Sequence, residues 1–498
     1  MNAVMARVGM RSSVALDQWL PIAAVLGVAA VMFHEWLLLL PTEALIALLV
    51  GTASLLLFRA QRVALQNELP FVDPCTMLLG VVLLRYAIGA IILYVWPMVP
   101  WTTRLALSWF EGSAALANIK QACILAVIGA LGLFAGAAVR FPIARGPVCE
   151  PGTWRGIREL GFVLAIICHS VSTFVEPRVG TGYAHILHVP AAFSGFLLAM
   201  CAYFAASARN SQERWKWVLF CIVCYGLSIL PGIRTGMREH FLKPLLLMAF
   251  GYVAARRRLP LLAFAGVIVL LVVVVLPVLN LAKQYATQTD FQSIERLERA
   301  SAGVSTSTDN SYIELAAANL LVRINLLTMS AIFSDYYPGR RPFLDGESFR
   351  LEAISFVPRF LWPDKPEISS TLDDYSREVG IITMDDTRTS AKFDGLSEYF
   401  INFGAWGVLL LKMVEGLYYR VMHTLLASRF GSLIATLFIG CFIIDNGDCF
   451  GFFMLIPSHV QSLAVWGLML VILADMVGKR SPGFLRRAPQ PAGQRVPA

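Results

Sequence analysis

Residues 118–139 read NIKQACILAVIGALGLFAGAAV, and this stretch decides the class of fold. It carries no charge beyond Lys120, and Arg140 follows it directly. An apolar run of about 20 residues has the length of an α-helix that crosses the hydrocarbon core of a bilayer. Backbone polar groups inside a bilayer must be satisfied within the segment, so a run of this kind must be helical. The stretch therefore predicts a transmembrane helix.

Similar runs recur outward from this stretch in both directions. The chain is 57% hydrophobic and only 15% charged, with a mean hydropathy of +0.65, and a soluble domain could not bury that much apolar surface. We expect an all-α polytopic membrane protein with about 12 transmembrane helices. Their predicted ranges are 17–34, 38–58, 74–97, 118–139, 159–175, 187–206, 217–232, 239–255, 259–281, 397–424, 431–446 and 450–476.

The basic residues indicate the orientation of these helices, because short cytoplasmic loops carry an excess of Lys and Arg. With the N-terminus in the cytoplasm, every strongly basic short connection falls on the cytoplasmic side, and so does the C-terminal tail. The residues concerned are Arg59, Arg62, Arg140, Arg145, Arg155, Arg158, Arg209, Arg214, Lys216, Arg256, Arg257, Arg258, Arg420 and Arg429. This pattern predicts a multi-pass protein of the bacterial inner membrane with both termini cytoplasmic. The net charge of +8 reflects this topology and contact with membrane lipids, and it predicts no nucleic-acid partner.

The predicted organisation has four parts. They are transmembrane helices 1–9 in residues 1–281, a large periplasmic loop with amphipathic helices in 282–396, transmembrane helices 10–12 in 397–476, and a basic cytoplasmic tail in 477–498. Polar residues interrupt the apolar stretch 312–333 of the loop, which we expect to form an amphipathic helix instead of a span. The chain has no P-loop and no metal-binding histidine spacing, so we expect neither a cofactor nor a metal.

The first candidate site is an external turn, residues 231–240, which read PGIRTGMREH. Its proline and glycine are predicted to end one helix, and the next helix is predicted to begin near Met237. Arg234 and Arg238 would then lie beside the free N–H groups of a helix N-terminus, an arrangement that suits a phosphate anion. Alternatively, the two arginines contact lipid headgroups or pair with Glu239.

The second candidate site is the loop stretch 357–366, which reads VPRFLWPDKP. Its prolines stiffen the backbone and prevent a continuous helix. A rigid backbone that presents Arg359 and Lys365 suits the capture of an anion. Trp362 could contribute to that site, or it could anchor the loop at the membrane interface.

The third candidate site is residues 388–404, RTSAKFDGLSEYFINFG, which lead from the loop into the next span. Arg388 and Lys392 are candidates for substrate binding. Asp394 and Glu398 are four residues apart and could share a helical face, where a desolvated carboxylate could act as a base. The alternative is that Asp394 caps the helix, with Glu398 favoured by the helix dipole.

Charged residues within the predicted spans form a further group. Lys412 and Glu415 are three residues apart on one helix, and we expect them to pair with each other or with a neighbouring helix. Arg85 lies inside the third span. Ionisable groups at this depth indicate either a functional site or a structural ion pair.

Together these stretches resemble the Wzy-type family of O-antigen and exopolysaccharide repeat-unit polymerases. The likeness rests on GIRTGMR at 232–238, on VPRFLWPDKP at 357–366, which is similar to the family's P-R-x-x-W-P-x-K-P pattern, and on EYFINFGAWG at 398–407, which is similar to its N-F-G-x-x-G start of a helix. The order of apolar runs, with a late large periplasmic loop, is similar along nearly the whole chain.

The resemblance implies a metal-independent glycosyltransferase with a GT-C-like fold. Such an enzyme transfers a growing glycan from undecaprenyl diphosphate onto the next lipid-linked repeat unit at the periplasmic face, alongside flippase and chain-length-regulator proteins. Four cations could hold the diphosphate: Arg234, Arg238, Arg359 and Lys365. The base could be Glu398, Asp394, Glu239 or His240. Four aromatic residues could stack on sugar rings: Tyr336, Tyr337, Trp362 and Tyr399.

Three other functions stay open on the sequence alone. An O-antigen ligase-like transferase uses the same donor with a different acceptor. A secondary transporter or flippase would have discontinuous helices and charges near the bilayer midplane. A non-catalytic assembly scaffold would need no site, and it would leave the external arginines unexplained.

Overall fold

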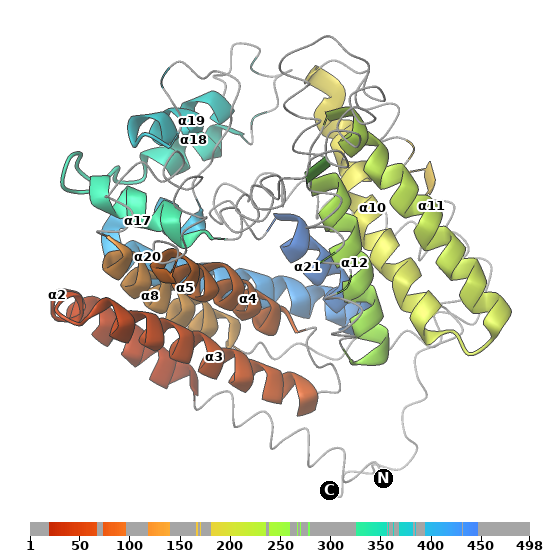
Figure 1. The fold of residues 1–498 in the computed structure, drawn as a ribbon, viewed down its shortest axis with the longest axis horizontal. Helices are drawn as coiled ribbons and strands as arrows, with labels where there is room; N and C mark the ends of the chain where they lie inside the picture. The colour runs from red at the N-terminus through yellow and green to blue at the C-terminus, as the bar shows by residue number, and fades with distance from the viewer. Residues whose placement is uncertain are drawn as a thin grey trace, which may run out of the picture.

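The computed structural model of the chain describes a defined set of residues. These are 19–66, 73–95, 118–139, 166–167, 170, 181–235, 239–258, 266, 269, 277–278, 325–355, 357, 362, 368–381, 384, 394–430 and 432–446. Within these ranges the regular structure is helical and contains no strand (Figure 1). The all-α prediction is confirmed for this part of the chain.

The described residues form helices of very different lengths. In chain order they are a helix at Trp19–Met32, α2 (His34–Leu38), α3 (Thr42–Gln66), α4 (Pro74–Val82), the π-helical turn η1 (Leu83–Ala87), α5 (Ile88–Val95), α8 (Ile119–Ala137), α10 (Thr181–Ser207), α11 (Ser211–Thr235), α12 (Glu239–Arg256), α17 (Leu327–Tyr336), α18 (Glu347–Ser355), α19 (Ile368–Glu378), α20 (Gly395–Phe430) and α21 (Ser432–Asn446).

Four of the described helical segments are long and apolar enough to cross a membrane. They are Thr42–Arg62, Pro74–Val95, Ile119–Ala137 and Gly395–Ala427, and shorter apolar helices lie at Trp19–Met32, Ser194–Ser207 and Leu433–Ile444. Nine of the predicted ranges contain a described helix. The other three, 159–175, 259–281 and 450–476, lie almost wholly outside the described residues.

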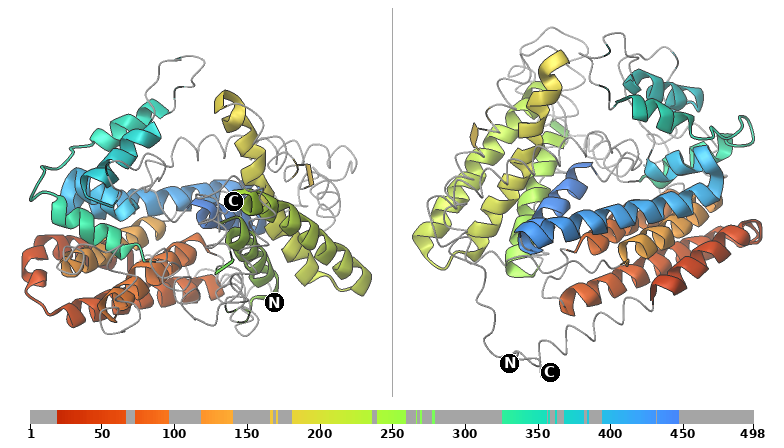
Figure 2. Two further views of the ribbon diagram at one scale, coloured as in Figure 1. Left: turned by 45° about the horizontal axis from the view of Figure 1, so that its top comes forward. Right: turned by 180° about the vertical axis from the view of Figure 1, so that it is seen from behind.

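The first bundle consists of α3, the continuous α4–η1–α5 segment, α8 and α20, which run side by side in both views (Figures 1 and 2). Helix α8 lies at the centre of this bundle, and 89% of the residues in its most apolar stretch are buried. Glycines allow the backbones of α8 and α20 to touch. A Cβ atom on Gly136 would lie 1.9 Å from the carbonyl oxygen of Met413, and one on Gly416 would lie 2.2 Å from that of Leu133. Such contacts between small residues are typical of helices packed within a membrane.

The second bundle consists of α10, α11 and α12, and α21 joins it to the first (Figure 1). The rings of Phe196 on α10 and Phe438 on α21 meet edge to face at 5.7 Å. On α21, Gly440 lies against Phe250 of α12 and Met77 of α4. Helix α21 therefore contacts both bundles through its small and aromatic residues.

The end of α11 corrects one sequence-based prediction. We expected Pro231 and Gly232 to end this helix, but α11 continues through both residues to Thr235. Pro244 likewise lies inside a continuous α12. Proline removes only one backbone hydrogen bond, and apolar helices that have no water to bond to stay helical around it.

The loop helices α17, α18 and α19 lie together at one end of the first bundle, which we call the loop end (Figures 1 and 2). Helix α17 falls partly within the apolar stretch 312–333, and the structure describes that stretch only from Asn325 onward. The inward face of α17, with Leu327, Ala331 and Phe333, is buried. This helix therefore packs against protein on that face.

Candidate functional site

Polar side chains are buried together at the loop end, where η1, α17, α18 and α20 meet. We call this group the buried polar centre, and each of its residues is at most 5% exposed. It consists of Tyr86, Ser330, Ser348, Asp394, Ser397, Glu398 and Asn402. Polar groups this deeply buried in a largely apolar protein are costly unless they are hydrogen-bonded, so their bonding partners define the site.

Asp394 joins three elements of the structure. It precedes α20, and its Oδ1 accepts a hydrogen bond from the backbone N–H of Ser397 at 3.3 Å, the geometry of a helix cap. The Ser397 hydroxyl also donates to Oδ1, and Oδ2 accepts from the hydroxyls of Tyr86 and, at 3.2 Å, Ser330. The predicted capping role of Asp394 is confirmed. The same carboxylate also holds η1 and α17 against the start of α20.

Tyr86 of the buried polar centre lies in the π-helical turn η1. Arg85, Tyr86 and Ala87 are three consecutive buried residues, which an ordinary helix with one buried stripe would not present. The wider turn leaves the carbonyl of Arg85 to accept a hydrogen bond from the N–H of Leu326 at 3.2 Å. Such turns occur frequently at functional sites. Here the turn attaches the chain that leads into α17 to a segment long and apolar enough to span a membrane.

Glu398 is completely buried and is tied to α18 through Ser348 and Asn402. The Ser348 hydroxyl donates to Glu398 Oε1 at 3.4 Å. The amide nitrogen of Asn402 donates to Ser348 Oγ at 2.8 Å and to the Glu398 carbonyl at 2.7 Å, and its Oδ1 accepts from the N–H of Gly346 at 3.0 Å. Ser348 and Asn402 therefore hold the Glu398 carboxylate in place, and both are held by hydrogen bonds of their own.

Helix α20 is broken directly after Asn402. Phe403 (φ −139°, ψ 17°) and Gly404 (φ 63°, ψ −156°) have non-helical backbone angles. Only glycine adopts the conformation of Gly404 without strain, and a Cβ atom there would lie 3.3 Å from the Phe343 ring. In the stretch Asn-Phe-Gly, the asparagine therefore binds the loop while the glycine makes the break. The predicted span 397–424 lies within α20, and the sequence analysis did not predict the break inside it.

An ion pair lies beyond the break on α20. Lys412 Nζ lies 2.7 Å from Glu415 Oε2, and both side chains are 13% exposed. The hydroxyl of Tyr399 donates to Glu415 at 3.4 Å, and Lys412 Nζ lies 5.4 Å from the centroid of the Tyr399 ring. The predicted pairing of Lys412 with Glu415 is confirmed. Tyr399 is completely buried by these contacts, so the structure leaves neither face of its ring open to a sugar.

A second group of polar and aromatic residues lies on the loop helices. Arg341 pairs with Glu378 and lies 3.9 Å from Glu347, and its guanidinium lies 5.7 Å from the centroid of the Tyr375 ring. The hydroxyl of Tyr336 donates to Glu378 at 3.1 Å. These contacts hold α17, α18 and α19 to one another. Tyr337, a predicted sugar-stacking residue next to Tyr336, is completely buried.

Tyr375 predicts that the packed loop helices α17, α18 and α19 lose stability at alkaline pH. Burial, and then the neighbouring carboxylate of Glu347, raise the pKa of Tyr375 to about 12. An unfolded tyrosine ionises near pH ~10, so between these values the unfolded chain binds fewer protons and stability falls as the pH rises. We expect an ultraviolet titration of Tyr375→Phe to lack one tyrosine that ionises near the pKa of about 12. A difference from wild type near the ordinary tyrosine value would contradict the buried placement of Tyr375.

The structure brings together only part of the predicted site. Asp394 directly precedes α20, and Glu398 and Tyr399 are neighbours near its start. Arg234 falls in the last turn of α11, His240 is partly buried at the start of α12, and Trp362 is 40% exposed. Five predicted residues lie outside the described part of the chain: Arg238, Arg359, Lys365, Arg388 and Lys392.

Sequence reasoning missed the hydroxyl donors of the centre, namely Tyr86, Ser330, Ser348 and Ser397. Tyr86 could have been suspected, because it follows Arg85 inside an apolar run. Ser330 interrupts the apolar stretch that became α17, which was a weaker signal. No pattern in the sequence singles out Ser348, because its role depends on the turn that places it beside Asn402.

The bond from Tyr86 to Asp394 supports a prediction about stability. Tyr86→Phe removes one hydrogen bond to a buried carboxylate, and such bonds contribute about 1.5–3 kcal/mol. We expect a lower thermal unfolding temperature in detergent. Tyr94→Phe is the matched control, because Tyr94 in the same span donates to the exposed Glu43. Equal unfolding temperatures for the two variants would show that the buried bond does not stabilise the protein.

These features define a class of protein: an all-helical chain whose helices can span a membrane, with buried acidic residues where those helices meet the loop helices. Residues 73–473 match a family described as a domain of unknown function (DUF8712), and the chain belongs to this family. No curated protein and no solved structure matches the chain.

Proposed function

We propose that this protein is a glycosyltransferase of the bacterial inner membrane that joins undecaprenyl-diphosphate-linked repeat units into O-antigen, capsule or exopolysaccharide. One observation carries the proposal. Asp394 and Glu398 are both buried and hydrogen-bonded in the buried polar centre, next to or within the stretch 398–407 that resembles the repeat-unit polymerases. The resemblance supplies the reaction, and the buried centre supplies an acidic group held where membrane helices meet loop helices.

The proposed reaction assigns separate roles to the acids and the cations. Glu398 is completely buried against α18, so the proposed reaction requires α18 to move away from α20 and admit the acceptor. Glu398 then takes the proton of the acceptor hydroxyl, the hydroxyl oxygen forms a bond to the anomeric carbon of the donor glycan, and the lipid diphosphate leaves. Asp394 acts as a positioning residue, because its carboxylate accepts hydrogen bonds from groups on η1, α17 and α20. Arg238 and Arg359 would stabilise the charge that develops on the departing diphosphate.

The topology of the proposal has about 12 spans, a GT-C-like fold and cytoplasmic termini. It is supported by the direction of the helices. Gly129 of α8 lies near Val408 of α20, and Gly136 lies near Met413, so the two helices run parallel. The positive-inside rule assigns the same outside-to-inside direction to both. The loop end is then periplasmic, as a polymerase of lipid-linked repeat units requires.

The proposal is tested by the glycans of a deletion strain beside those of the complemented strain. We expect long polymer to disappear from the gel while single-repeat lipid-linked species accumulate. Long polymer that persists on its lipid carrier would instead identify a ligase. Unchanged glycans would contradict every role in glycan assembly.

The cations give a second test in the complemented strain. We expect Arg238→Ala and Arg359→Ala each to abolish polymer while the protein stays inserted at the wild-type level, because each removes a charge from the diphosphate site. Arg209→Ala is the control. Arg209 lies in the α10–α11 turn, at the end of the second bundle opposite the α11–α12 connection that contains Arg238. Normal polymer from both test variants would contradict the assigned site.

A transporter is the second candidate, and the broken helix α20 favours it. Helix breaks and buried charges are typical of transporter binding sites, and α20 has both in Gly404 and the Lys412–Glu415 pair. A transporter would leave the length of the polymer unchanged and alter only its location. The same gel, run on separated inner-membrane and surface fractions, distinguishes the two functions.

A further inference from the structure

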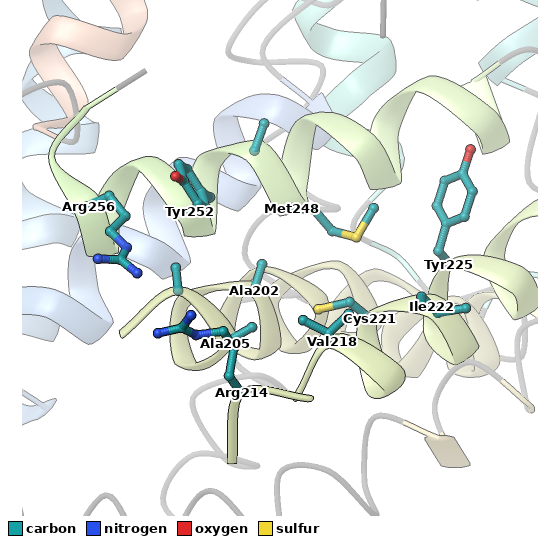
Figure 3. A pocket seen from close by; sticks show the side chains of 12 residues that line it. Ala202, Ala205, Arg214, Val218, Cys221, Ile222, Tyr225, Met248, Tyr252 and Arg256 are labelled. Atoms are coloured by element: carbon teal, nitrogen blue, oxygen red, sulfur yellow. The ribbon is translucent and has the colours of Figure 1, made fainter. Parts of the chain in front are cut away.

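A groove in the second bundle lies apart from the buried polar centre. It has a volume of about 590 Å³ and runs between α10, α11 and α12. This volume falls within the roughly 300–1,000 Å³ range of small-molecule sites. Figure 3 shows an apolar floor and walls, formed by residues such as Ala202, Val218, Ile222 and Met248. The polymerase mechanism uses none of these residues.

Two arginines lie at one end of the groove. Figure 3 shows the side chains of Arg214 and Arg256 at the same end, with Tyr225 at the other. Arg214 donates to the backbone carbonyl of Ala208 at 3.2 Å, which holds its guanidinium there. Within the described ranges, neither Arg214 nor Arg256 forms an ion pair with a carboxylate.

The surroundings strengthen the positive charge at this end. Four further cations lie near this end, in the α10–α11 turn, at the start of α11 and directly after α12: Arg209, Lys216, Arg257 and Arg258. Glu213 is the single acidic residue in the described stretches 205–220 and 250–258. An anionic group is therefore strongly favoured at this end, and an apolar chain is favoured along the rest of the groove.

The length of the groove matches one leaflet of a bilayer. Along α11 it extends from Arg214 to Tyr225, a difference of eleven residues. At about 1.5 Å per residue this is about 16 Å, roughly half of a hydrocarbon core of about 30 Å. An acyl chain whose headgroup lies at the arginines would end near the bilayer midplane.

We propose that this groove binds one anionic phospholipid of the cytoplasmic leaflet. Its phosphate lies between Arg214 and Arg256, and one acyl chain lies along Val218, Ile222 and Met248. Juxtamembrane cations attract the anionic lipids of that leaflet, and the positive-inside rule places the α10–α11 turn there. Binding at this site does not depend on the glycosyltransferase function.

Native mass spectrometry of the full chain tests the proposal. The protein is exchanged from detergent into nanodiscs of phosphatidylglycerol or phosphatidylcholine, released, and examined for retained lipid. We expect one tightly retained phosphatidylglycerol, and about ten-fold less retained phosphatidylcholine, because only the former carries a net negative charge. Soluble glycerol 3-phosphate should not displace the lipid. Equal retention of the two lipids, or displacement by glycerol 3-phosphate, would overturn the proposal.

Charge-matched variants separate this site from general attraction to a basic surface. The double variant Arg214→Gln, Arg256→Gln should lose about ten-fold or more of the retained phosphatidylglycerol. The control is Arg209→Gln, Arg258→Gln, which removes two charges from the same end but outside the groove. It should retain lipid as wild type does. Equal losses from both double variants would show that surface charge alone holds the lipid.

Ala205→Leu, which fills the groove without changing its charge, should also lower the amount of retained lipid. Retention at the wild-type level would contradict the proposed path of the acyl chain.

Discussion

Glu398→Gln is expected to lower polymer formation by about 10²–10⁴-fold, the contribution that a positioned general base makes to a rate. The amide is almost the same shape as the carboxylate, and its oxygen can still accept the hydrogen bond from Ser348. It cannot take the proton of the acceptor hydroxyl. The measurement is the amount of polymer on a gel, normalised to the amount of inserted protein.

Two further variants make the Glu398 result specific. Glu35→Gln makes the same chemical change at a side chain that is 87% exposed, and it should leave polymer unchanged. Glu398→Asp keeps the charge but shortens the side chain, so it should retain part of the activity. Normal polymer from Glu398→Gln would show that another group is the base and would remove Glu398 from the mechanism.

The sequence predicted the helices well where length and apolar character decide the structure. The stretch 118–139 became α8, Ile119–Ala137, and the stretch 431–446 became α21, Ser432–Asn446. A long apolar run has one low-energy solution in a bilayer, so local composition is sufficient to find it. The pairing of Lys412 with Glu415 was also predictable from the local sequence, because residues three apart on a helix are neighbours.

The sequence predicted less well where contacts between distant residues decide the structure. The break at Gly404 depends on the turn around Gly346, whose N–H bonds to Asn402. The π-helical turn at Arg85 depends on Leu326, which lies far along the chain and donates to its carbonyl. Neither feature follows from apolar character alone. The buried polar centre is built from these contacts, so the sequence identified its acids but not the groups that hold them.

Gly136→Leu is expected to abolish the folded protein or to lower its stability by at least about 3 kcal/mol, the upper part of the usual cost of overpacking. A Cβ atom at this position would lie 1.9 Å from a backbone oxygen of α20 and 2.8 Å from the backbone nitrogen of Leu417. A side chain can turn away from an inserted atom, but backbone cannot. The two helices must therefore separate, and the start of α20, which carries Asp394 and Glu398, would move with them.

Gly80→Leu provides the comparison for this substitution, because Gly80 also lies in an apolar helix but has open space around its Cβ position. We expect Gly80→Leu to give a single symmetric peak in size-exclusion chromatography and a wild-type melting temperature. Gly136→Leu should give aggregate or a strongly lowered melting temperature. If both variants behave like wild type, α8 and α20 do not approach as closely as the structure requires. The position of the buried polar centre against the membrane helices would then need to be revised.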